Sequence, residues 1–343
     1  MNILFFFSAV ASLSVFISGT PLGNLFRNWM NEHNVQYETM DQESRAFNTW
    51  VDNHYYIERV NAQNLTYRLG HNRFSAFSHE DYLAMIRGYR GLNSPYVSNP
   101  VRLNIRQEET INEQIPANVD WVSAGAVTGV KDQGQCGSCW SFSTTGAIEG
   151  AYYIKYNTLV SFSEQQLVDC DNLSNGGRDH GCNGGLMDNA FSWVAKNNGL
   201  CREEAYPYVS GTTKTAGTCN SKICTNVANS DIAKYIDVQS NSDSALMNAI
   251  VAQPVSVAIE ADQRDFQLYK SGVYTGTCGT NLDHGVLVVG YGTQDGTDYY
   301  KVKNSWSTSW GDQGYIYLGR GAKYNGGAGQ CGILMEASYP VLV

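Results

Sequence analysis

The chain has 343 residues, and its 23 basic and 32 acidic side chains give a formal net charge of −9 at pH 7. This acidic balance disfavours nucleic acid as a partner, because a phosphate backbone attracts basic surfaces. Hydrophobic residues make up 43% of the chain and charged residues 16%, which excludes an intrinsically disordered protein and indicates one large or two smaller folded domains.

The first segment, residues 1–19, is nearly all apolar or small, which is typical of the apolar region of a secretory signal peptide. Gly19 lies near a plausible cleavage point, although no Lys or Arg precedes the run. The alternative is a membrane anchor, because the run approaches the roughly 20 residues that a spanning helix needs. The serines and the terminal position of the run favour the cleaved signal.

The second segment, residues 20–114, contains nine Arg but neither Lys nor Cys. Within it, apolar residues recur between Asp41 and Gln63 at nearly helical spacing, which predicts a helix. The polar stretch from Gly91 to Glu109 has the composition of a linker.

From Ile115 onward the chain is rich in Gly, Tyr and Cys, and its patterns change from helical to strand-like. Helices are predicted over Ser138–Tyr156, Ser163–Cys170 and Leu186–Asn197, and strands over Val255–Ile259, Gly285–Gly290, Tyr299–Val302 and Tyr315–Leu318. A helical half followed by a strand half predicts an α+β protein with two lobes. A cleft between two lobes is a favoured place for a ligand site.

All nine cysteines lie between Cys136 and Cys331. Eight of them can form four disulfides in an exported protein, which leaves one thiol for a reactive role. Cys136 and Cys139 also form a C-x-x-C pair, for which a redox motif or half of a zinc site are alternatives. Neither is favoured, because no βαβ pattern accompanies the pair and Cys219 and Cys224 are too far apart for the common zinc site.

Cys139 is the candidate nucleophile. It follows a Gly-rich turn at the predicted start of a helix, where unpaired N–H groups and the helix dipole lower the pKa of a thiol. Six residues upstream, the side-chain amide of Gln133 can donate to an oxyanion.

Two further residues complete a candidate triad. His284, at the mouth of a predicted strand, is the candidate base, and Asn304 can orient its imidazole without adding charge. Trp306 and Trp310 would shield that hydrogen bond from water. Each of these residues taken singly is more often structural, but their order and spacing together favour catalysis.

Several motifs make the chain resemble papain-like cysteine peptidases of the cathepsin L type, from about residue 24 to the C-terminus. They are Gln133–Phe142, Ser163–Cys170, Gly181–Gly185, Tyr206–Tyr208, Leu282–Gly285 and Asn304–Trp306. The resemblance implies a papain-like two-lobed α+β fold. Its helical lobe would cover about residues 115–225, and an antiparallel, β-barrel-like lobe about residues 226–343.

The resemblance also implies a mechanism. Cys139 and His284 would rest as a thiolate–imidazolium pair, and the thiolate would attack a peptide carbonyl. The side chain of Gln133 and the backbone N–H of Cys139 would stabilise the oxyanion. His284 would protonate the leaving amine, and water would then hydrolyse the thioester. This chemistry requires no cofactor and no metal.

The same resemblance implies three disulfides, which are Cys136–Cys182, Cys170–Cys219 and Cys278–Cys331. Cys201 and Cys224 remain, and they would form a fourth bridge or stay as two separate thiols.

Residues 20–114 resemble the inhibitory prosegment of the family, with maturation near Gln114–Ile115 and a mature peptidase over residues 115–343. Three positions of the prosegment depart from the family pattern, because Trp50 stands where Phe is usual, Arg45 is one residue out of register and Ala76 replaces an Asp. That Asp is thought to help sense acid, so the pH trigger of this chain is left open.

By the positions of the family motifs, the resemblance also implies the residues that would bind substrate, which are Gly184, Gly185, Leu186, Met187, Ala258, Leu282, Asp283, Gly285, Trp306 and Glu336. Some of these residues line the pocket for the substrate side chain that lies two residues before the scissile bond. Most of the lining is apolar or small, so we expect the pocket to prefer Leu, Phe or Val in the substrate. Glu336 would lie at the floor of this pocket, where its carboxylate pairs with a substrate Arg or, alternatively, turns to solvent.

The remaining expectations concern glycosylation, localisation, oligomeric state and partners. Asn64 and Asn172 head two glycosylation sequons. The chain is expected to be a monomeric zymogen of the secretory pathway, destined for a lysosome, a vacuole or the exterior. Its partners would be protein substrates and its own prosegment, without nucleic acid or stable membrane insertion. A peptidase-fold protein that binds without cutting and a thiol oxidoreductase are the alternatives.

Overall fold

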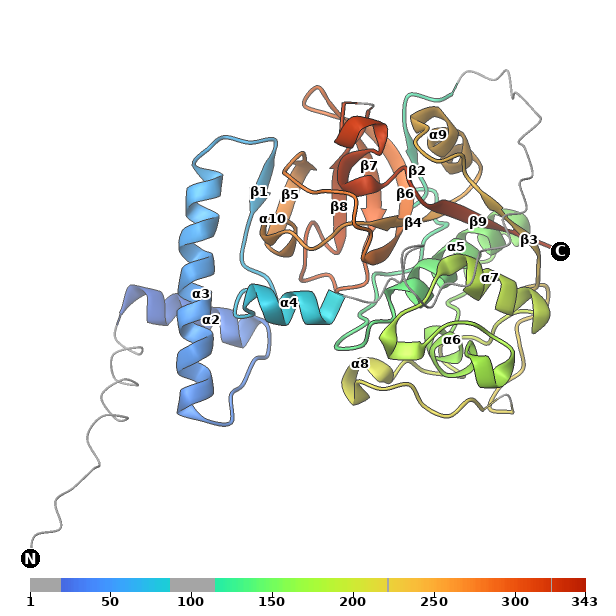
Figure 1. Ribbon diagram of the computed structural model, residues 1–343, viewed down its shortest axis with the longest axis horizontal. Coiled ribbons are helices and arrows are strands. Elements are labelled where there is room, and N and C mark those ends of the chain that lie inside the picture. The colour runs from blue at the N-terminus through green and yellow to red at the C-terminus, as the bar shows by residue number, and fades with distance from the viewer. Residues whose placement is uncertain (1–19, 87–114, 221, 322) are drawn as a thin grey trace, which may run out of the picture.

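The computed structural model describes residues 20–86, 115–220, 222–321 and 323–343 (Figure 1). The predicted signal peptide, the predicted linker and Gln114 of the predicted maturation site lie outside these residues. A helical N-terminal part comes first in the described chain, followed by a lobe rich in helices and a lobe rich in strands (Figure 1).

Two helices, α2 (Pro21–Glu32) and α3 (Met40–Asn61), form the N-terminal part. Each begins at a threonine whose hydroxyl accepts from a backbone N–H of the first turn, Thr20 for α2 and Thr39 for α3. Their buried contact contains Phe26, Trp29, Ala46 and Trp50. The observed α3 confirms the helix predicted between Asp41 and Gln63.

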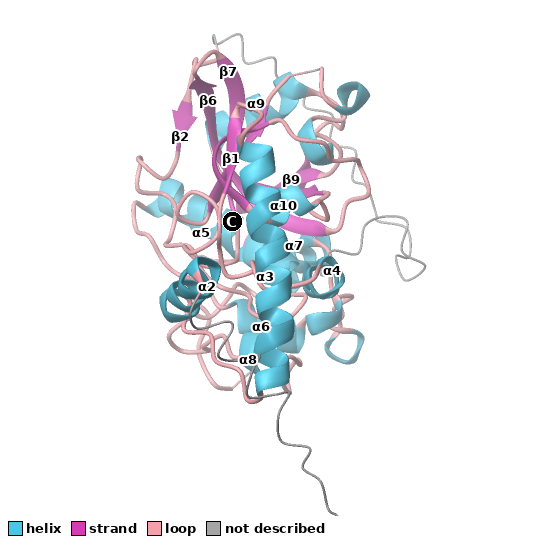
Figure 2. Ribbon diagram, turned by 90° about the vertical axis from the view of Figure 1, so that its left-hand side faces the viewer, coloured by secondary structure: helices cyan, strands magenta, loops and turns pink. Residues whose placement is uncertain are grey.

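The N-terminal part docks on the strand-rich lobe through main-chain pairing. Its strand β1 (Tyr67–Leu69) lies antiparallel to β5 (Tyr269–Tyr274), and α4 (His79–Ile86) follows. Figure 2 looks onto this side and shows α3 in front of the strands. The N-terminal part therefore adds an edge strand to the sheet of the lobe that it covers.

The helical lobe contains α5 (Cys139–Tyr156), α6 (Glu164–Cys170), α7 (Met187–Lys196), α8 (Ser210–Thr213) and the 3₁₀ turns η1 (Leu173–Asn175) and η2 (Gly181–Asn183). Helix α5 is buried on all sides from Cys139 to Tyr152. Glycines make this possible, because a Cβ at Gly146 would lie 2.8 Å from Leu287 and one at Gly150 would lie 2.5 Å from Pro254. The three predicted helices are confirmed, with ends shifted by one residue.

The strand-rich lobe is built on a single sheet. Its strands are β3 (Ile232–Asp237), β4 (Val255–Ile259), β5, β6 (His284–Gln294), β7 (Thr297–Lys303), β8 (Tyr315–Gly319) and β9 (Ala337–Leu342), with β2 (Val119–Asp120) paired to β6. The helices α9 (Asp243–Ala252) and α10 (Arg264–Gln267) and the turns η3 (Asn325–Gly327) and η4 (Gln330–Gly332) connect them. Each of the four predicted strands lies within an observed strand or overlaps it.

The sheet corrects the expected β-barrel-like lobe. In the described residues the strands run in the open order β1-β5-β8-β7-β6-β4-β9-β3, without pairing between the two ends. The pairing is also not antiparallel throughout, because β5 and β8 are parallel. The expected barrel was wrong because strand pairing between distant segments is not readable from alternation within each segment.

The two lobes meet where α5 crosses β4 and β6. The hydroxyl of Ser143 on α5 donates to Val286 O at 2.7 Å, and the hydroxyl of Ser256 on β4 donates to Ser143 O at 2.9 Å. These buried hydrogen bonds hold the helix that begins at Cys139 against the strand that begins at His284.

Four disulfides, Cys136–Cys182, Cys170–Cys219, Cys201–Cys224 and Cys278–Cys331, crosslink the described chain. These are the three pairs that the resemblance implied, together with the optional fourth. The pairing of Cys136 with Cys182 overturns the C-x-x-C alternatives, because Cys139 then has no neighbouring thiol with which to act.

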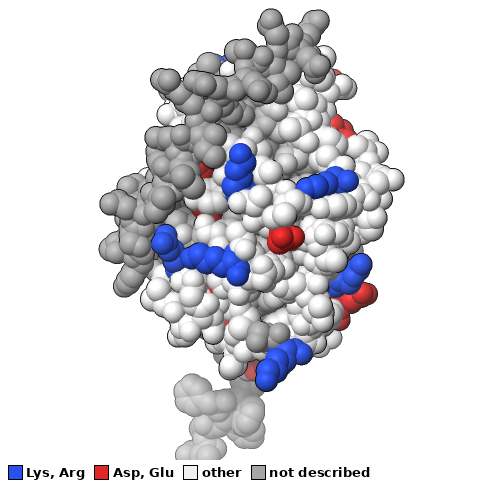
Figure 3. All heavy atoms as spheres, turned by 90° about the vertical axis from the view of Figure 1, so that its right-hand side faces the viewer, with Lys and Arg blue, Asp and Glu red and all other residues white. Residues whose placement is uncertain are grey.

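Charge is sparse on the face that lies opposite the N-terminal part. Figure 3 shows a few Lys and Arg side chains and fewer Asp and Glu side chains on this face, with mostly uncharged surface between them. Among the described helices, none is both long enough and apolar enough to cross a membrane.

Candidate active site

Cys139 is the first residue of α5 and carries the free thiol of the chain. The preceding turn is held by the Cys136–Cys182 disulfide and by the N–H of Gly137, which donates to Cys182 O at 3.0 Å. The N-cap residue Ser138 makes no side-chain cap. The thiol thus lies at an uncapped helix N-terminus, as the sequence predicted, and is fully buried.

His284, the first residue of β6, is buried and makes one side-chain hydrogen bond. Its Nε2–H donates to Oδ1 of Asn304 at 2.7 Å, just after the end of β7. The Trp306 ring stacks on the imidazole with a centroid distance of 4.6 Å. Nδ1 of His284 is buried without a hydrogen-bond partner among the described residues, so this nitrogen is available to exchange a proton.

The sulfur and the imidazole come from different lobes and are brought together by the main chain. The N–H of Gly285, directly after His284, donates to the sulfur of Cys139 at 3.3 Å. A Cβ at Gly285 would lie 3.3 Å from the Cα of Trp140, so glycine is what allows this close approach.

Burial controls the protonation of both groups in the precursor. Burial raises the pKa of the Cys139 thiol to about 12. The hydrogen bond from the Gly285 N–H lowers this pKa, but by less than burial raises it. Burial also lowers the pKa of His284 to about 4, although the hydrogen bond to Asn304 raises it. In this state the pair is a neutral thiol and a neutral imidazole. In the precursor, the desolvation of a buried charge outweighs the helix dipole, and the ion pair expected of the active peptidase stays a prediction.

Gln133 is oriented by three side-chain contacts. Its Oε1 accepts from the hydroxyl of Ser305 at 2.6 Å and from Nε1 of Trp306 at 3.2 Å. Its Nε2 donates to Cys136 O at 3.0 Å, which leaves the second amide hydrogen for another acceptor. The predicted donor is therefore fixed beside the turn that carries Cys139, and Ser305 is a supporting residue that the sequence did not reveal.

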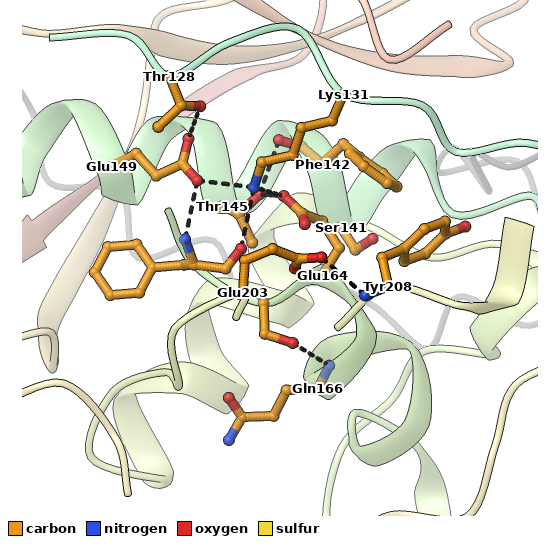
Figure 4. A network of polar contacts seen from close by, with 12 residues as sticks. Thr128, Lys131, Ser141, Phe142, Thr145, Glu149, Glu164, Gln166, Glu203 and Tyr208 are labelled. Carbon is orange, nitrogen blue, oxygen red and sulfur yellow. Dashed lines mark hydrogen bonds and ion pairs between the residues drawn. The ribbon is translucent and has the colours of Figure 1, made fainter. Parts of the chain in front are cut away.

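A buried charge network lies behind α5, and the sequence did not predict it (Figure 4). Nζ of Lys131 donates to Glu149 at 3.0 Å and to Glu164 at 2.6 Å, and both carboxylates are 1% exposed. Burial alone would lower the pKa of Lys131, but the two carboxylates raise it. Only Glu164 lies in a recognisable motif, so the pattern carried no signal for the other two residues.

This network borders a small cavity between the lobes, which Lys303, Asn304 and Ser305 also line. Lys303 donates to the hydroxyl of Thr128 at 2.9 Å, and burial lowers its pKa to about 8. The segment that carries Asn304 is thereby connected to the same charges that support α5.

Most of the predicted substrate-binding residues also come together. Leu186, Met187 and Ala258 share one buried cluster, and Leu282 packs against it. Gly285 pairs with Ala258 across β4 and β6, and a Cβ there would lie 3.1 Å from the sulfur of Met187.

The other predicted substrate-binding residues lie around this cluster. The backbone O of Glu336 accepts from Ala258 N at 3.0 Å, which brings Glu336 to the same strands. Asp283 precedes the imidazole, and its Oδ1 accepts from Ala261 N at 2.8 Å. Gly185 packs against Trp140, the neighbour of the thiol, and Gly184 precedes it with φ 101°.

Two carboxyls that the sequence did not single out lie near Glu336. Burial raises the pKa of Asp188 to about 7, and Asp237 and Glu336 add to the rise. A hydroxyl contact from Ser338 opposes it. The three carboxyls Asp188, Asp237 and Glu336 therefore lie close enough to influence one another.

The N-terminal part packs directly on the tryptophan that covers the imidazole. The rings of Phe74 and Tyr82 meet Trp306 edge-on, at centroid distances of 5.3 and 5.8 Å. The hydroxyl of Tyr82 donates to Ala261 O at 2.5 Å. In this state the tryptophan that stacks on the imidazole is thus itself covered by residues from the N-terminal part.

The two sequons differ in their surroundings. Asn64 is exposed, with φ 52°, in the turn between α3 and β1. Asn172 is half-buried, and its Nδ2 donates to Asp169 O at 2.8 Å while its Oδ1 accepts from Ser174 N at 3.0 Å.

Comparison with known proteins agrees with this arrangement. The family described as papain family cysteine protease matches residues 115–341, and the cathepsin propeptide inhibitor domain (I29) matches residues 26–82. Cysteine proteinase COT44 of Brassica napus is 43% identical over 325 residues, which cover 93% of this chain and 96% of that protein. Probable cysteine protease RD21B of Arabidopsis thaliana is 42% identical over 333 residues, which cover 94% of this chain and 67% of that protein.

Solved precursor structures are similar over almost the whole chain. The proform of Amb a 11, a ragweed pollen cysteine protease, gives a TM-score of 0.80 at 34% identity, covering 95% of this chain and 97% of that one. Digestive procathepsin L 3 of Tenebrio molitor gives 0.80 at 37% identity, covering 94% and 100%. The chain belongs to the papain family of cysteine proteases, is of the cathepsin L type, and carries the propeptide inhibitor domain that makes it a zymogen.

Proposed function

We propose that Cys139, His284, Asn304 and Gln133 are the catalytic residues with which this peptidase cleaves peptide bonds inside proteins. The observation that supports this most is the chain of contacts from the sulfur of Cys139 through the Gly285 N–H to the segment of His284, whose imidazole donates to Asn304. A nucleophile, a base and an orienting acceptor are together the requirement for acyl transfer through a thiol.

Activation in this proposal begins when the prosegment leaves. Water then reaches both groups, the thiol pKa falls, the imidazole pKa rises, and the proton moves from sulfur to Nδ1. The thiolate attacks the peptide carbonyl, and the C–S bond forms as the carbonyl π electrons move to oxygen. Gln133 and the N–H of Cys139 donate to that oxyanion.

The second half of the reaction returns every proton. The imidazolium of His284 protonates the amine as the C–N bond breaks, which leaves a thioester. The neutral imidazole then takes a proton from water, whose oxygen attacks the thioester and releases a carboxylic acid. Asn304 keeps the ring in one orientation through both steps.

For specificity, we infer a pocket built from the cluster of Leu186, Met187, Ala258 and Leu282, which suits Leu, Phe or Val two residues before the scissile bond. Glu336, with Asp188 and Asp237 nearby, supports acceptance of Arg as well.

For export and processing, we propose that the protein is made as a secreted zymogen. We infer a signal peptide over residues 1–19, a prosegment over 20–114 and a mature domain over 115–343, delivered to a lysosome, a vacuole or the exterior. The four disulfides support an oxidising compartment. Of the two sequons, Asn64 is the better candidate for glycosylation, because its amide is exposed whereas that of Asn172 is engaged.

The test is hydrolysis of paired fluorogenic substrates, Phe-Arg and Arg-Arg, by acid-processed protein, with Cys139→Ala as the control. We expect turnover in the wild type and none in the variant. A thiol-directed epoxide inhibitor should label the wild type once per chain. Correctly processed wild-type protein without turnover would overturn the proposal and favour a binding role.

A further inference from the structure

Two carboxyl groups are buried next to each other behind the predicted substrate-binding segment. Asp171 ends α6 as its C-cap and is 0% exposed, and Asp179 lies before η2 and is 2% exposed. Their side chains are within hydrogen-bonding reach of each other. The Oδ2 atom of each has no other partner among the described residues.

Two ionised carboxylates cannot stay in such contact without water or a cation, because like charges in a buried site repel strongly. A single proton held between them gives each of the two unpartnered oxygens a hydrogen bond. The pair would then act as one group with one negative charge.

Two cationic residues, Lys196 and Arg178, lie near the pair in the described structure, and neither forms a side-chain ion pair with it. Lys196 on α7 acts on Asp171 from a distance and forms no ion pair with it. Arg178 contributes its backbone N–H, which donates to Oδ1 of Asp171 at 3.0 Å. His180 follows Asp179 directly, and its N–H donates to Gly184 O at 2.9 Å.

Asp179 holds the segment that would bind the substrate backbone. Its Oδ1 accepts from Leu186 N and from Nδ2 of Asn189, both at 3.0 Å. It also packs against Gly185, where a Cβ would lie 2.7 Å from Cγ of Asp179 and 2.7 Å from the ring of Trp140. The carboxyl therefore sets the position of Gly185 and Leu186 relative to the residue that follows the thiol.

We propose that Asp171 and Asp179 share one proton, and that this proton-bound pair positions Gly184–Leu186 to receive the substrate. Loss of the proton at alkaline pH would drive the carboxyls apart, loosen the segment and weaken substrate binding. The inference rests on the proposed function, since it takes peptide to bind along Gly184 and Gly185. Both residues are positioning residues, because they act through the segment and do not touch the reacting atoms.

The direction of the pKa shifts agrees with a retained proton. Burial is the main cause of the raised pKa of Asp179, and the neighbouring Asp171 adds to it, while Asn189 and Leu186 N oppose it. Burial likewise raises the pKa of Asp171.

Asp179→Asn tests the idea, because it imitates the protonated acid. The amide can still accept from Leu186 N and Asn189 through oxygen, while its NH₂ donates permanently to Asp171. We expect the KM of the wild type to rise several-fold at alkaline pH with little change in kcat. In Asp179→Asn, KM should stay flat with pH. Asp179→Ala should raise KM about tenfold at every pH, as expected when a buried acceptor of two donors is lost.

The controls separate this idea from folding and from the proposed function. Titration of Cys139 with an epoxide inhibitor counts correctly folded sites, and Glu204→Gln removes an exposed carboxyl of the same lobe and should behave as the wild type. If wild type and Asp179→Asn show the same rise of KM with pH, or if Asp179→Ala leaves KM unchanged, the inference is wrong.

A readout without turnover completes the design. Infrared difference spectra at neutral pH should show the band of a protonated carboxyl in the wild type that Asp179→Asn lacks. Absence of that band overturns the shared proton even if the enzyme is active. Its presence in a protein without turnover places the failure on the proposed function.

Discussion

The backbone N–H of Gly285 donates to the sulfur of Cys139 across 3.3 Å. This contact joins the first residue of helix α5 to the second residue of strand β6. Because Gly285 follows His284 directly, this hydrogen bond, together with those of Ser143 and Ser256, fixes where the imidazole lies relative to the thiol.

The first prediction concerns the reactivity of Cys139 in the precursor. Burial raises the pKa of this thiol to about 12, so at pH 8 only ~10⁻⁴ of it is thiolate, the form that reacts. Alkylation by iodoacetamide should therefore be slow in the precursor and fast after removal of the prosegment. Mass spectrometry over a pH series measures both rates. Equal rates in the two forms would show that burial does not govern the thiol.

The second prediction concerns Gln133. Gln133→Ala should lower kcat by about 10²–10³ with little change in KM, because an oxyanion donor acts mainly in the transition state. The matched control is Ser305→Ala, which removes one contact to Oε1 of Gln133 but keeps the amide donor. Steady-state kinetics compare the two variants after active-site titration. A larger loss in Ser305→Ala than in Gln133→Ala would contradict the donor role.

A third prediction concerns acid and the prosegment, where Ala76 replaces the expected Asp. Nδ1 of His54 and Nε2 of His71 are 3.0 Å apart, and the Trp50 ring stacks on both imidazoles. Burial lowers the pKa of His71 to about 4 from 6.5, and His54 and His33 add to the shift. Oε1 of Glu58 lies 3.8 Å from Nε2 of His54 and is the nearby carboxylate that a protonated His54 would face.

The sign follows from proton uptake. The unfolded chain protonates His71 near pH 6.5 and the folded one only near pH 4, so this contribution to stability is complete above pH 6.5 and is lost as pH falls to 4. His71→Gln should shift the onset of processing to lower pH, whereas His79→Gln, at an exposed histidine, should not. Processing followed on gels from pH 4 to 7 decides this, and identical profiles for both variants would exclude His71.

The fourth prediction concerns the network behind α5. Lys131→Met leaves Glu149 and Glu164 buried without their cation, which should destabilise the fold by about 3–5 kcal/mol. Lys234→Met, at an exposed lysine, should change stability by less than about 0.5 kcal/mol. Urea unfolding at pH 7 measures both. A small loss in Lys131→Met would mean that the carboxyls take up protons instead.

The fifth prediction concerns the acidic floor of the pocket. Glu336→Ala should lower kcat/KM for the Arg-Arg substrate by about tenfold or more and leave a Leu substrate nearly unchanged, because only the cationic side chain needs the carboxylate. Asp188→Asn is the control that keeps Glu336 but reduces the neighbouring negative charge. If turnover of Arg-Arg is unchanged in Glu336→Ala, Arg is bound elsewhere or the carboxylate faces solvent.

The sequence by itself determined the family, the chemical types at the site and the elements that carry them. Cys139 at a helix start, His284 at a strand start and the odd cysteine among nine are local features, and local patterns decide where helices and strands begin. For the same reason the helix over residues 41–63 was predicted within two residues of its observed ends.

Only the tertiary structure decided the protonation of the ionisable side chains and the pairing of the strands. The neutral state of Cys139 and His284, the shared environment of Asp171 and Asp179, and the charges around Lys131 all depend on burial by segments far away in the chain. The open sheet and the parallel pairing of β5 with β8 are likewise long-range. Desolvation and strand pairing are properties of the packed chain, and neither leaves a periodic signal in the sequence.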